Sequence, residues 1–304
     1  MNKKKILITG GTGFIGYHLS KRCIKLNWSV TSLSTTKPKK IRKLKKVIYK
    51  ICDVSSYNQI NKKIKSDYDY VVNLAGYVDH SHRVKTMKSH YNGFKNLTYF
   101  FLNSKIKKFV QIGSCVEYGK MRSPQHEKKT NNKTFSIYGN AKLLSTKLSQ
   151  NLYKKFNFPI TVLRLYLVYG PHQDINRVIP ITIQNSIKNK KFDCSNGLQL
   201  RDFTYVDDVV AAIIKTLKNE DSPGQIINIG QGKPLLVKDV INKICKLLDS
   251  GRPQFGKIRL RKDEIKDLHP SIAKAKKVLN WTPKIEIIPG LKKTINYYKK
   301  MSKK

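Results

Sequence analysis

The sequence ILITGGTGFIG at residues 6–16 decides the fold. A short apolar run leads directly into a G-x-x-G-x-x-G pattern formed by Gly10, Gly13 and Gly16, and then into a predicted helix. The first glycine permits a tight turn, the second lets the backbone approach a pyrophosphate, and the third lets helix and strand pack closely. The free N–H groups at the helix N-terminus attract phosphate. This stretch therefore predicts a dinucleotide-binding strand–helix unit.

Short β-branched runs alternate with stretches of helical spacing through the first half of the chain. The predicted strands are residues 6–9, 29–33, 47–51, 70–74, 109–112 and 160–165. The predicted helices are residues 14–26, 57–64, 83–103 and 137–156. This alternation predicts an α/β fold with a Rossmann-like, doubly wound parallel sheet, which binds ligands beyond the carboxyl ends of its strands.

The pattern loosens after residue 165. Predicted helices at residues 178–189, 206–218, 236–248 and 289–298 alternate there with short strands and Gly/Pro turns. We expect a dinucleotide-binding domain at residues 1–165 and a smaller α/β substrate lobe at residues 166–304, with the chain crossing between them.

The composition is strongly basic, with 61 Lys and Arg against 19 Asp and Glu, a formal net charge of +42. Such a charge attracts nucleic acid, anionic membranes and phosphate-bearing molecules. A genome of low G+C content would however enrich Lys, Asn and Ile together, and the lysines are spread along the whole chain. The charge alone therefore assigns no function.

Other features of composition exclude several classes of protein. No apolar run approaches the ~18 residues of a membrane span. The five cysteines are widely scattered and form no C-x-x-C, so they indicate neither a disulfide framework nor a metal site. We expect a reduced, cytoplasmic protein that binds neither a metal nor a membrane.

The position that selects between NAD and NADP carries no acid. Sites that prefer NAD place Asp or Glu about 20 residues after the glycines to hold the ribose 2′-hydroxyl. Here that position is Ser34, and no carboxylate occurs between Gly10 and Asp53. A hydroxyl together with Lys37 suits a 2′-phosphate, so we expect NADP to be preferred. NAD bound without the acid is the alternative.

Three residues form a candidate catalytic set. Tyr138 and Lys142 are four residues apart, on one face of a predicted helix. Ser114 follows a predicted strand and so lies at the carboxyl edge of the sheet. An ammonium group about 4 Å from a phenol can lower its pKa by up to about three units, toward the range of a general acid or base. We therefore predict that Ser114, Tyr138 and Lys142 carry the chemistry.

Together these motifs resemble the extended short-chain dehydrogenases/reductases, in their NAD(P)-dependent nucleotide-sugar epimerase/dehydratase branch. The resemblance spans nearly the whole chain. It also includes the stretches NLAG at residues 73–76, RLYLVYGP at 164–171, RVIP at 177–180, RDFTYVDDV at 201–209 and AKAKKVLNWTP at 273–283. The last two stretches are rather specific to enzymes that act on sugar nucleotides.

The resemblance implies roles for individual residues. Lys142 would hold the nicotinamide ribose, Ser114 would bond the reacting sugar oxygen, and Tyr138 would move its proton. The implied cofactor-binding residues are Gly10, Thr12, Gly13, Phe14, Ile15, Gly16, Ser34, Lys37, Asp53, Val54, Leu74, Ala75, Gly76, Tyr138 and Lys142. The implied substrate-binding residues are Tyr166, Leu167, Arg177, Arg201 and Arg261, with Arg201 and Arg261 directed at the diphosphate. A homodimer through residues 83–103 and 137–156 is also implied.

The residues around Ser114 restrict the reaction. The 4,6-dehydratases of this family carry Asp-Glu directly after the catalytic Ser or Thr, whereas Cys115 and Val116 stand here. Dehydration is therefore disfavoured. The fucose-type epimerase-reductases use a Cys two residues before the Tyr of this motif, and Cys115 is one position away from that place. They also use a His where Arg177 stands, so 3,5-epimerisation is doubtful as well.

Two reactions remain. The absence of an acid at Ser34 to bond the ribose 2′-hydroxyl favours the one that uses NADPH. One is reduction of a nucleotide-linked 4-keto-6-deoxyhexose by NADPH, as in surface polysaccharide biosynthesis; the other is 4-epimerisation with tightly held NAD. Leu167 stands where the family often has an Asn that touches the substrate phosphate, so the base and sugar stay open. Some proteins with this fold bind RNA, but the joint presence of Ser114, Tyr138 and Lys142 argues against a nucleic-acid partner.

Overall fold

A large parallel sheet organises the protein. The structure, a computed structural model, describes residues 3–79, 82–129, 134–260 and 264–302. In this part of the chain the strand order of the large sheet is β11-β6-β5-β4-β1-β2-β3, and every pairing is parallel. Its strands are β1 (Lys5–Thr9), β2 (Ser29–Ser34), β3 (Val47–Ile51), β4 (Tyr70–Asn73), β5 (Lys108–Ser114), β6 (Ile160–Leu165) and β11 (Ile226–Ile229). The predicted Rossmann-like α/β fold is confirmed.

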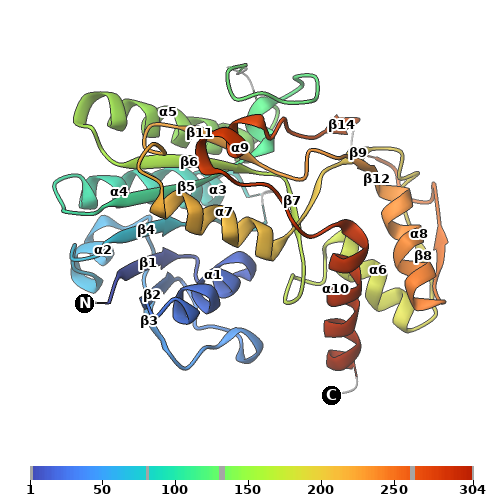
Figure 1. The fold of residues 1–304 in the computed structure, drawn as a ribbon. Coiled ribbons are helices and arrows are strands. Elements are labelled where there is room, and N and C mark those ends of the chain that lie inside the picture. Colours follow the sequence, from blue (N-terminus) through green and yellow to red (C-terminus); the bar gives the residue numbers. More distant parts are fainter. Residues whose placement is uncertain (1–2, 80–81, 130–133, 261–263, 303–304) are drawn as a thin grey trace.

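Helices cover both faces of the sheet because its strands are apolar on both sides. Ile6 and Ile8 pack into one core and Leu7 into the other, as the two-residue period of a strand requires. One face carries α1 (Phe14–Lys25), α7 (Val206–Lys218) and α9 (Ala273–Leu279). The other carries α2 (Tyr57–Lys63), α3 (Arg83–Met87), α4 (Gly93–Phe101) and α5 (Ile137–Phe156) (Figure 1). Two short 3₁₀ helices, η1 (Lys40–Arg42) and η3 (Cys115–Tyr118), follow β2 and β5.

The second half of the chain builds a smaller lobe beside the sheet (Figure 1). Its helices are α6 (Val178–Ile187), α8 (Val237–Leu248) and α10 (Ile287–Ser302). Its short strands are β7 (Leu167–Tyr169), β8 (Lys191–Asp193), β9 (Leu200–Arg201), β10 (Phe203–Tyr205), β12 (Leu235–Leu236), β13 (Arg252–Gln254) and β14 (Asp267–Leu268). They pair as β10-β7, β12-β9-β14 and β13-β8. The division at residue 165 stays a prediction, and α7 and β11 return from beyond it to the large sheet.

The helix predicted over residues 83–103 is interrupted. A π-helical turn, η2 (Lys88–Asn92), separates α3 from α4. Within it, the Ser89 hydroxyl accepts a hydrogen bond from the Tyr77 N–H at 2.9 Å, and His90 Nε2 lies 3.1 Å from the Tyr77 carbonyl oxygen. The wider turn thus lets two consecutive side chains bond the segment that follows β4. Hydropathy spacing alone does not reveal such a turn, which often marks a functional site.

No helix in the described residues is both long enough and apolar enough to cross a membrane.

Candidate active site

A pocket of about 840 Å³ opens at the carboxyl ends of the central strands. It lies where the strand order reverses between β1 and β4, the place at which doubly wound sheets bind ligands. The predicted residues that line it are Gly10, Thr12, Gly13, Phe14, Ile15, Gly16, Ser34, Asp53, Val54, Leu74, Ala75, Gly76, Ser114, Tyr138, Lys142, Tyr166, Leu167 and Arg177. Lys37 and Arg201 are not among the lining residues. Arg261 lies outside the described residues.

The glycine turn can pack against its neighbours only because two of its residues have no side chain. Gly10 has φ +70°, and a Cβ there would lie 2.8 Å from the Leu74 carbonyl oxygen. A Cβ at Gly16 would lie 2.6 Å from Gly11 Cα. Helix α1 begins after Gly13, which supplies no side-chain cap, and its first residues, Phe14 to Gly16, line the pocket, so their N–H groups lack a side-chain partner at its edge. These features fit the pyrophosphate of a dinucleotide.

The end of β2 forms the region predicted to hold the ribose. The Ser34 hydroxyl donates to the Leu33 carbonyl oxygen at 2.7 Å and accepts from the Thr12 N–H at 3.4 Å. Thr35 and Thr36 continue this wall of the pocket, whereas the side chain of Lys37 is exposed. Beside it, just after the neighbouring strand β3, Asp53 is the first carboxylate after the glycine turn; the preceding Cys52 N–H donates to the Ser34 carbonyl oxygen at 3.0 Å. The wall is therefore rich in hydroxyl groups beside β2.

A chain of buried polar side chains supports the floor of the pocket. The Thr9 hydroxyl donates to Asn73 Oδ1, and Asn73 Nδ2 donates to Gln111 Oε1 at 2.7 Å, so the chain crosses β1, β4 and β5. Asn73 Oδ1 also accepts from the Ala75 N–H at 3.2 Å. These bonds fix the segment from Leu74 to Gly76, which lines the pocket.

Ser114, Tyr138 and Lys142 come together as predicted from the sequence. Ser114 ends β5 and caps η3, while Tyr138 and Lys142 lie in the first turns of α5. The Ser114 hydroxyl is hydrogen-bonded to the Tyr138 side chain. The Lys142 ammonium donates to the Ile112 carbonyl oxygen at 2.6 Å, and its Nζ lies 5.8 Å from the centroid of the Tyr138 ring. Their joint role in catalysis remains a prediction.

The pKa shift expected for Tyr138 is wrong in direction. Burial raises the pKa of the Tyr138 hydroxyl to about 12, against the opposing effects of the Ser114 hydrogen bond and the Arg177 charge. Burial also lowers the pKa of Lys142 to about 8, although the charge of Glu117 opposes this. Desolvation disfavours the charged form of each group, and it outweighs the hydrogen bond and the charges that favour that form. At neutral pH Tyr138 therefore keeps its proton.

His90 lines the pocket, although no sequence motif predicts it there. Its ring packs edge-on against the Tyr138 ring with centroids 4.8 Å apart. A Cβ at Gly76 would overlap the His90 ring, so that glycine is what allows the ring to lie there. The π-helical turn that presents His90 is a backbone feature, and no spacing rule for α-helices would have found it.

The residues predicted to bind the substrate differ in their exposure and in their hydrogen-bond and ion-pair partners. The Tyr166 hydroxyl donates to Gln125 Oε1 at 2.8 Å, and Leu167 begins β7. Arg177 is exposed at the pocket, close enough for its charge to lower the pKa of Tyr138. Arg201 is buried and forms an ion pair with Glu264. Its predicted contact with the substrate diphosphate remains a prediction.

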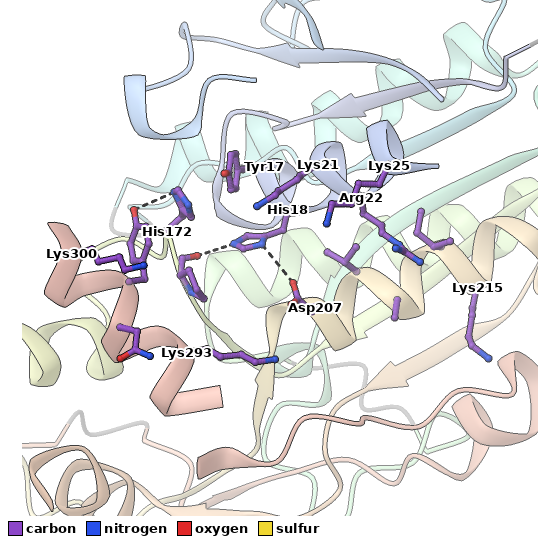
Figure 2. A pocket seen from close by; sticks show the side chains of 16 residues that line it. Tyr17, His18, Lys21, Arg22, Lys25, His172, Asp207, Lys215, Lys293 and Lys300 are labelled. Atoms are coloured by element: carbon purple, nitrogen blue, oxygen red, sulfur yellow. Dashed lines mark hydrogen bonds and ion pairs between the residues drawn. The ribbon is translucent and has the colours of Figure 1, made fainter. Parts of the chain in front are cut away.

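A second pocket, of about 740 Å³, lies between α1, α7 and α10 (Figure 2). Its described lining includes six cationic side chains and one carboxylate, Asp207, which lies 3.7 Å from His18 Nδ1. The cations are Lys21, Arg22, Lys25, Lys215, Lys293 and Lys300. None of the predicted catalytic residues lines this pocket, so we take the first pocket as the candidate active site.

Comparison with known proteins identifies the family. The model of the NAD dependent epimerase/dehydratase family matches residues 6–230. The chain belongs to this family. It is therefore an enzyme of a family of NAD-dependent nucleotide-sugar enzymes, which confirms the resemblance drawn from the motifs.

Several relatives align over almost their whole length. A UDP-glucuronate 4-epimerase of Thermodesulfobacterium geofontis is 28% identical, over 96% of this chain and 95% of its own. A CDP-abequose synthase of Salmonella muenchen is 28% identical, over 96% and 97%. The crystal structure of UDP-glucuronic acid 4-epimerase from Bacillus cereus, in complex with UDP-glucuronic acid and NAD, superposes with a TM-score of 0.87 at 25% identity, covering 98% and 99%.

Proposed function

We propose that this enzyme uses NADPH to reduce the 4-keto group of a nucleotide-linked 4-keto-6-deoxyhexose, a step in surface polysaccharide biosynthesis. The observation that carries the proposal is the wall at the end of β2, where Ser34, Thr35 and Thr36 line the pocket in place of an acid. Hydroxyl groups can bond a 2′-phosphate that a carboxylate would repel. NADPH is consumed in reductions, so this cofactor preference favours the reductive reaction.

The pocket's own residues support reduction in three ways. The glycine turn and the N-terminus of α1 would hold the dinucleotide, which supplies the hydride when bound. Lys142, tied to the Ile112 carbonyl, would orient the nicotinamide ribose. Tyr138, protonated at neutral pH, would donate its proton to the substrate's carbonyl oxygen, which Ser114 positions.

The surroundings of Ser114 disfavour dehydration. Loss of water needs an acid and a base beside the sugar, but burial raises the pKa of the Cys115 thiol to about 12. Glu117 is fully buried and ion-paired with Arg164. Neither side chain is available to move a proton to or from a substrate.

Epimerisation at carbon 4 is the second candidate, and Arg177 is the observation that favours it. Its guanidinium lines the pocket near Tyr138, where it could pair with a negatively charged substituent on the sugar. UDP-glucuronate, named for one of the relatives, carries a carboxylate on its sugar. The two candidates differ in how they use the cofactor.

An assay with both types of substrate separates them. We expect the purified enzyme to oxidise added NADPH when given CDP-, dTDP- or GDP-linked 4-keto-6-deoxyhexoses. Conversion of UDP-glucuronate to its 4-epimer without added cofactor, by a protein that purifies with bound NAD, would instead establish the epimerase.

The cofactor preference is tested by Ser34→Asp. An acid at this position would repel a 2′-phosphate and bond a 2′-hydroxyl, so the ratio of kcat/KM for NADPH over NADH should fall by about tenfold or more, equivalent to ~1.4 kcal/mol. Steady-state kinetics with each cofactor measure this ratio, and the NADH value in the same variant is the internal control. A wild-type enzyme that uses NADH more efficiently than NADPH would refute the preference.

The predicted homodimer is supported by exposed apolar side chains on the helices concerned, Val84 on α3, Tyr99 on α4 and Phe156 on α5. We expect light scattering to give a mass near twice 35.0 kDa.

A further inference from the structure

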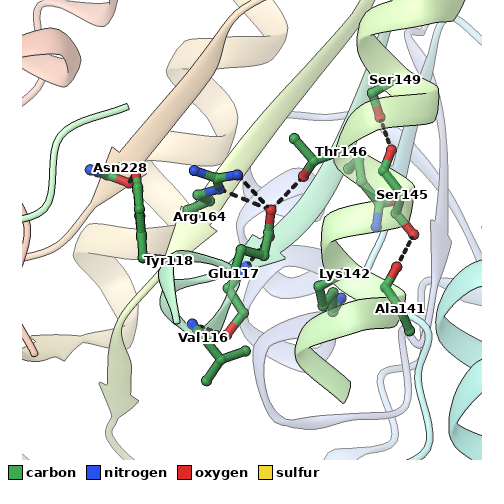
Figure 3. A network of polar contacts seen from close by, with 12 residues as sticks. Val116, Glu117, Tyr118, Ala141, Lys142, Ser145, Thr146, Ser149, Arg164 and Asn228 are labelled. Atoms are coloured by element: carbon green, nitrogen blue, oxygen red, sulfur yellow. Dashed lines mark hydrogen bonds and ion pairs between the residues drawn. The ribbon is translucent and has the colours of Figure 1, made fainter. Parts of the chain in front are cut away.

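A fully buried carboxylate lies directly behind the candidate catalytic residues. Glu117 Oε1 accepts a hydrogen bond from the Ser114 N–H at 2.8 Å. Glu117 Oε2 accepts from the Thr146 hydroxyl at 2.6 Å and from Arg164 Nε at 2.9 Å. The side chains of Glu117 and Arg164 are both 0% exposed. Figure 3 shows Glu117 between Arg164 on β6 and Thr146 on α5.

Through these bonds Glu117 connects the elements that carry the catalytic residues. Thr146 lies one turn beyond Lys142 on α5, so its bond ties that helix to the carboxylate. The other carboxylate oxygen holds the backbone of Ser114 at the end of β5. The Lys142 bond to Ile112 is a second tie between α5 and β5. Glu117 and Lys142 thus set the separation between Ser114 and the helix that presents Tyr138.

The bond from the Ser114 N–H completes a capping box at the start of η3, which explains one carboxylate oxygen of Glu117 but not its buried ion pair with Arg164. Replacing a buried ion pair with apolar side chains is often neutral or stabilising, because two charges must be desolvated. Arg164 Nη1 has no hydrogen-bond partner among the described residues, although its guanidinium carbon lies 4.4 Å from the centroid of the Tyr118 ring. What a carboxylate offers here, and an apolar side chain cannot, is simultaneous bonding to Ser114 N–H and Thr146 hydroxyl.

We propose that Glu117 is a positioning residue, which fixes the Ser114 backbone relative to α5 so that the Ser114 hydroxyl remains bonded to the Tyr138 hydroxyl. Glu117 touches neither of those hydroxyls and acts through the Ser114 N–H and through α5. The proposal rests on the proposed catalytic roles of Ser114 and Tyr138. Small displacements matter here, since a shift of about 1 Å in a reacting group can cost ~100-fold in rate.

The sharpest test is Thr146→Val, which removes the hydroxyl between α5 and Glu117 and keeps the shape of the side chain. Its matched control is Thr161→Val. Thr161 is also buried, and its hydroxyl donates to the Ser222 carbonyl oxygen at 2.7 Å, away from the pocket. The two substitutions should lower the melting temperature by similar amounts. We expect kcat to fall about tenfold in Thr146→Val and less than twofold in Thr161→Val, with KM for NADPH unchanged in both.

A readout without substrate separates this proposal from the proposed function. Cys115 is buried beside Ser114, so loosening of that backbone should raise its alkylation rate, measured by peptide mass spectrometry. We expect severalfold faster alkylation in Thr146→Val than in Thr161→Val. If alkylation is faster in Thr146→Val but the wild-type enzyme does not reduce the 4-keto sugar nucleotides, the proposed function is rejected and the structural role of Glu117 is kept. An active enzyme in which the two variants share the same kcat would overturn the positioning proposal.

A charge-neutral variant tests the carboxylate itself. Glu117→Gln leaves Arg164 as a buried unpaired charge and can fail to fold, whereas Glu117→Val/Arg164→Leu removes both charges. We expect the double variant to fold, to bind NADPH with wild-type affinity by fluorescence titration, and to lose about 100-fold in kcat. A folded double variant with near-normal kcat would overturn the proposal.

Discussion

Burial moves the two ionisable groups of the candidate site in opposite directions. The pKa of Tyr138 is raised to about 12 and that of Lys142 is lowered to about 8. The tyrosine therefore holds its proton firmly, while the lysine is close to losing its own. At neutral pH the tyrosine thus carries the proton that a reduction needs, but its pKa lies above the range in which a general acid is most efficient, and Lys142 beside it loses its charge above about pH 8.

The first prediction concerns pH. Because the pKa of Lys142 lies near 8, a rise in pH through that value removes its charge and should weaken its hold on the nicotinamide ribose. We expect kcat/KM for the cofactor to fall above about pH 8. In Lys142→Met the residual activity should lack this decline. A wild-type profile that stays flat to about pH 10 would contradict the assignment.

The sequence predicted which residues come together in the candidate catalytic set, but not the direction of their pKa shifts. The spacing of Tyr138 and Lys142 follows from helix geometry, and Ser114 follows from the end of a strand. The direction of each pKa shift depends on desolvation by residues distant in sequence, which spacing cannot reveal. The role proposed for Glu117 also depends on Arg164 and Thr146, which lie 47 and 29 residues away along the chain.

At the scale of elements, the glycine turn and α1 form the part of the site that is hardest to alter. A Cβ at Gly16 would meet the backbone of Gly11 at 2.6 Å, and backbone cannot move aside as a flexible side chain can. Helix α1 would have to shift away from β1, and its N–H groups would shift with it.

We therefore predict that Gly16→Ala weakens NADPH binding more than tenfold and lowers the free energy of unfolding by about 1–3 kcal/mol. Fluorescence titration and urea unfolding measure the two effects. Gly256→Ala is the control, since Gly256 has φ +84° and nothing within 4 Å of an added Cβ. It should lose stability through backbone strain without losing affinity. Equal affinity in both variants would count against the glycine turn as the cofactor site.

Most elements could be predicted from periodicity, and the exceptions have physical reasons. Strands β1, β4 and β6 are buried on both faces for almost their whole length and form nearly continuous apolar segments, whereas the edge strand β3 is partly exposed. The π-helical turn at Lys88–Asn92 interrupts a helix whose hydropathy gives no break. Strand β11 belongs to the large sheet through its pairing with β6, a contact between segments more than 60 residues apart.

At the scale of the whole molecule, the dominant feature is the net charge of +42. With 61 cations and 19 carboxylates, most cations have no carboxylate available to them, and six gather around the pocket between α1, α7 and α10 (Figure 2). Like charges at such density repel one another and destabilise the compact state. Salt shortens the range of this repulsion from ~10 Å at 0.1 M to ~3 Å at 1 M.

We expect the melting temperature to rise by about 3–6 °C between about 0.05 M and about 0.5 M NaCl, followed by calorimetry. The variant Lys21→Glu/Lys300→Glu should melt higher than wild type at low salt and respond less to added salt. A melting temperature that falls or stays constant with salt would show that the charges do not limit stability.

The central claim is that Tyr138 donates a proton while hydride reaches carbon 4 of a nucleotide sugar. Its most direct test follows deuterium from 4-deuterated NADPH into a nucleotide-linked 4-keto-6-deoxyhexose, in wild type and in Tyr138→Phe. We predict deuterium at carbon 4 of the product and a rate about 10³-fold lower in Tyr138→Phe, within the range for losing a general acid. Near-normal transfer in Tyr138→Phe, or no transfer by the wild-type enzyme, would contradict the claim.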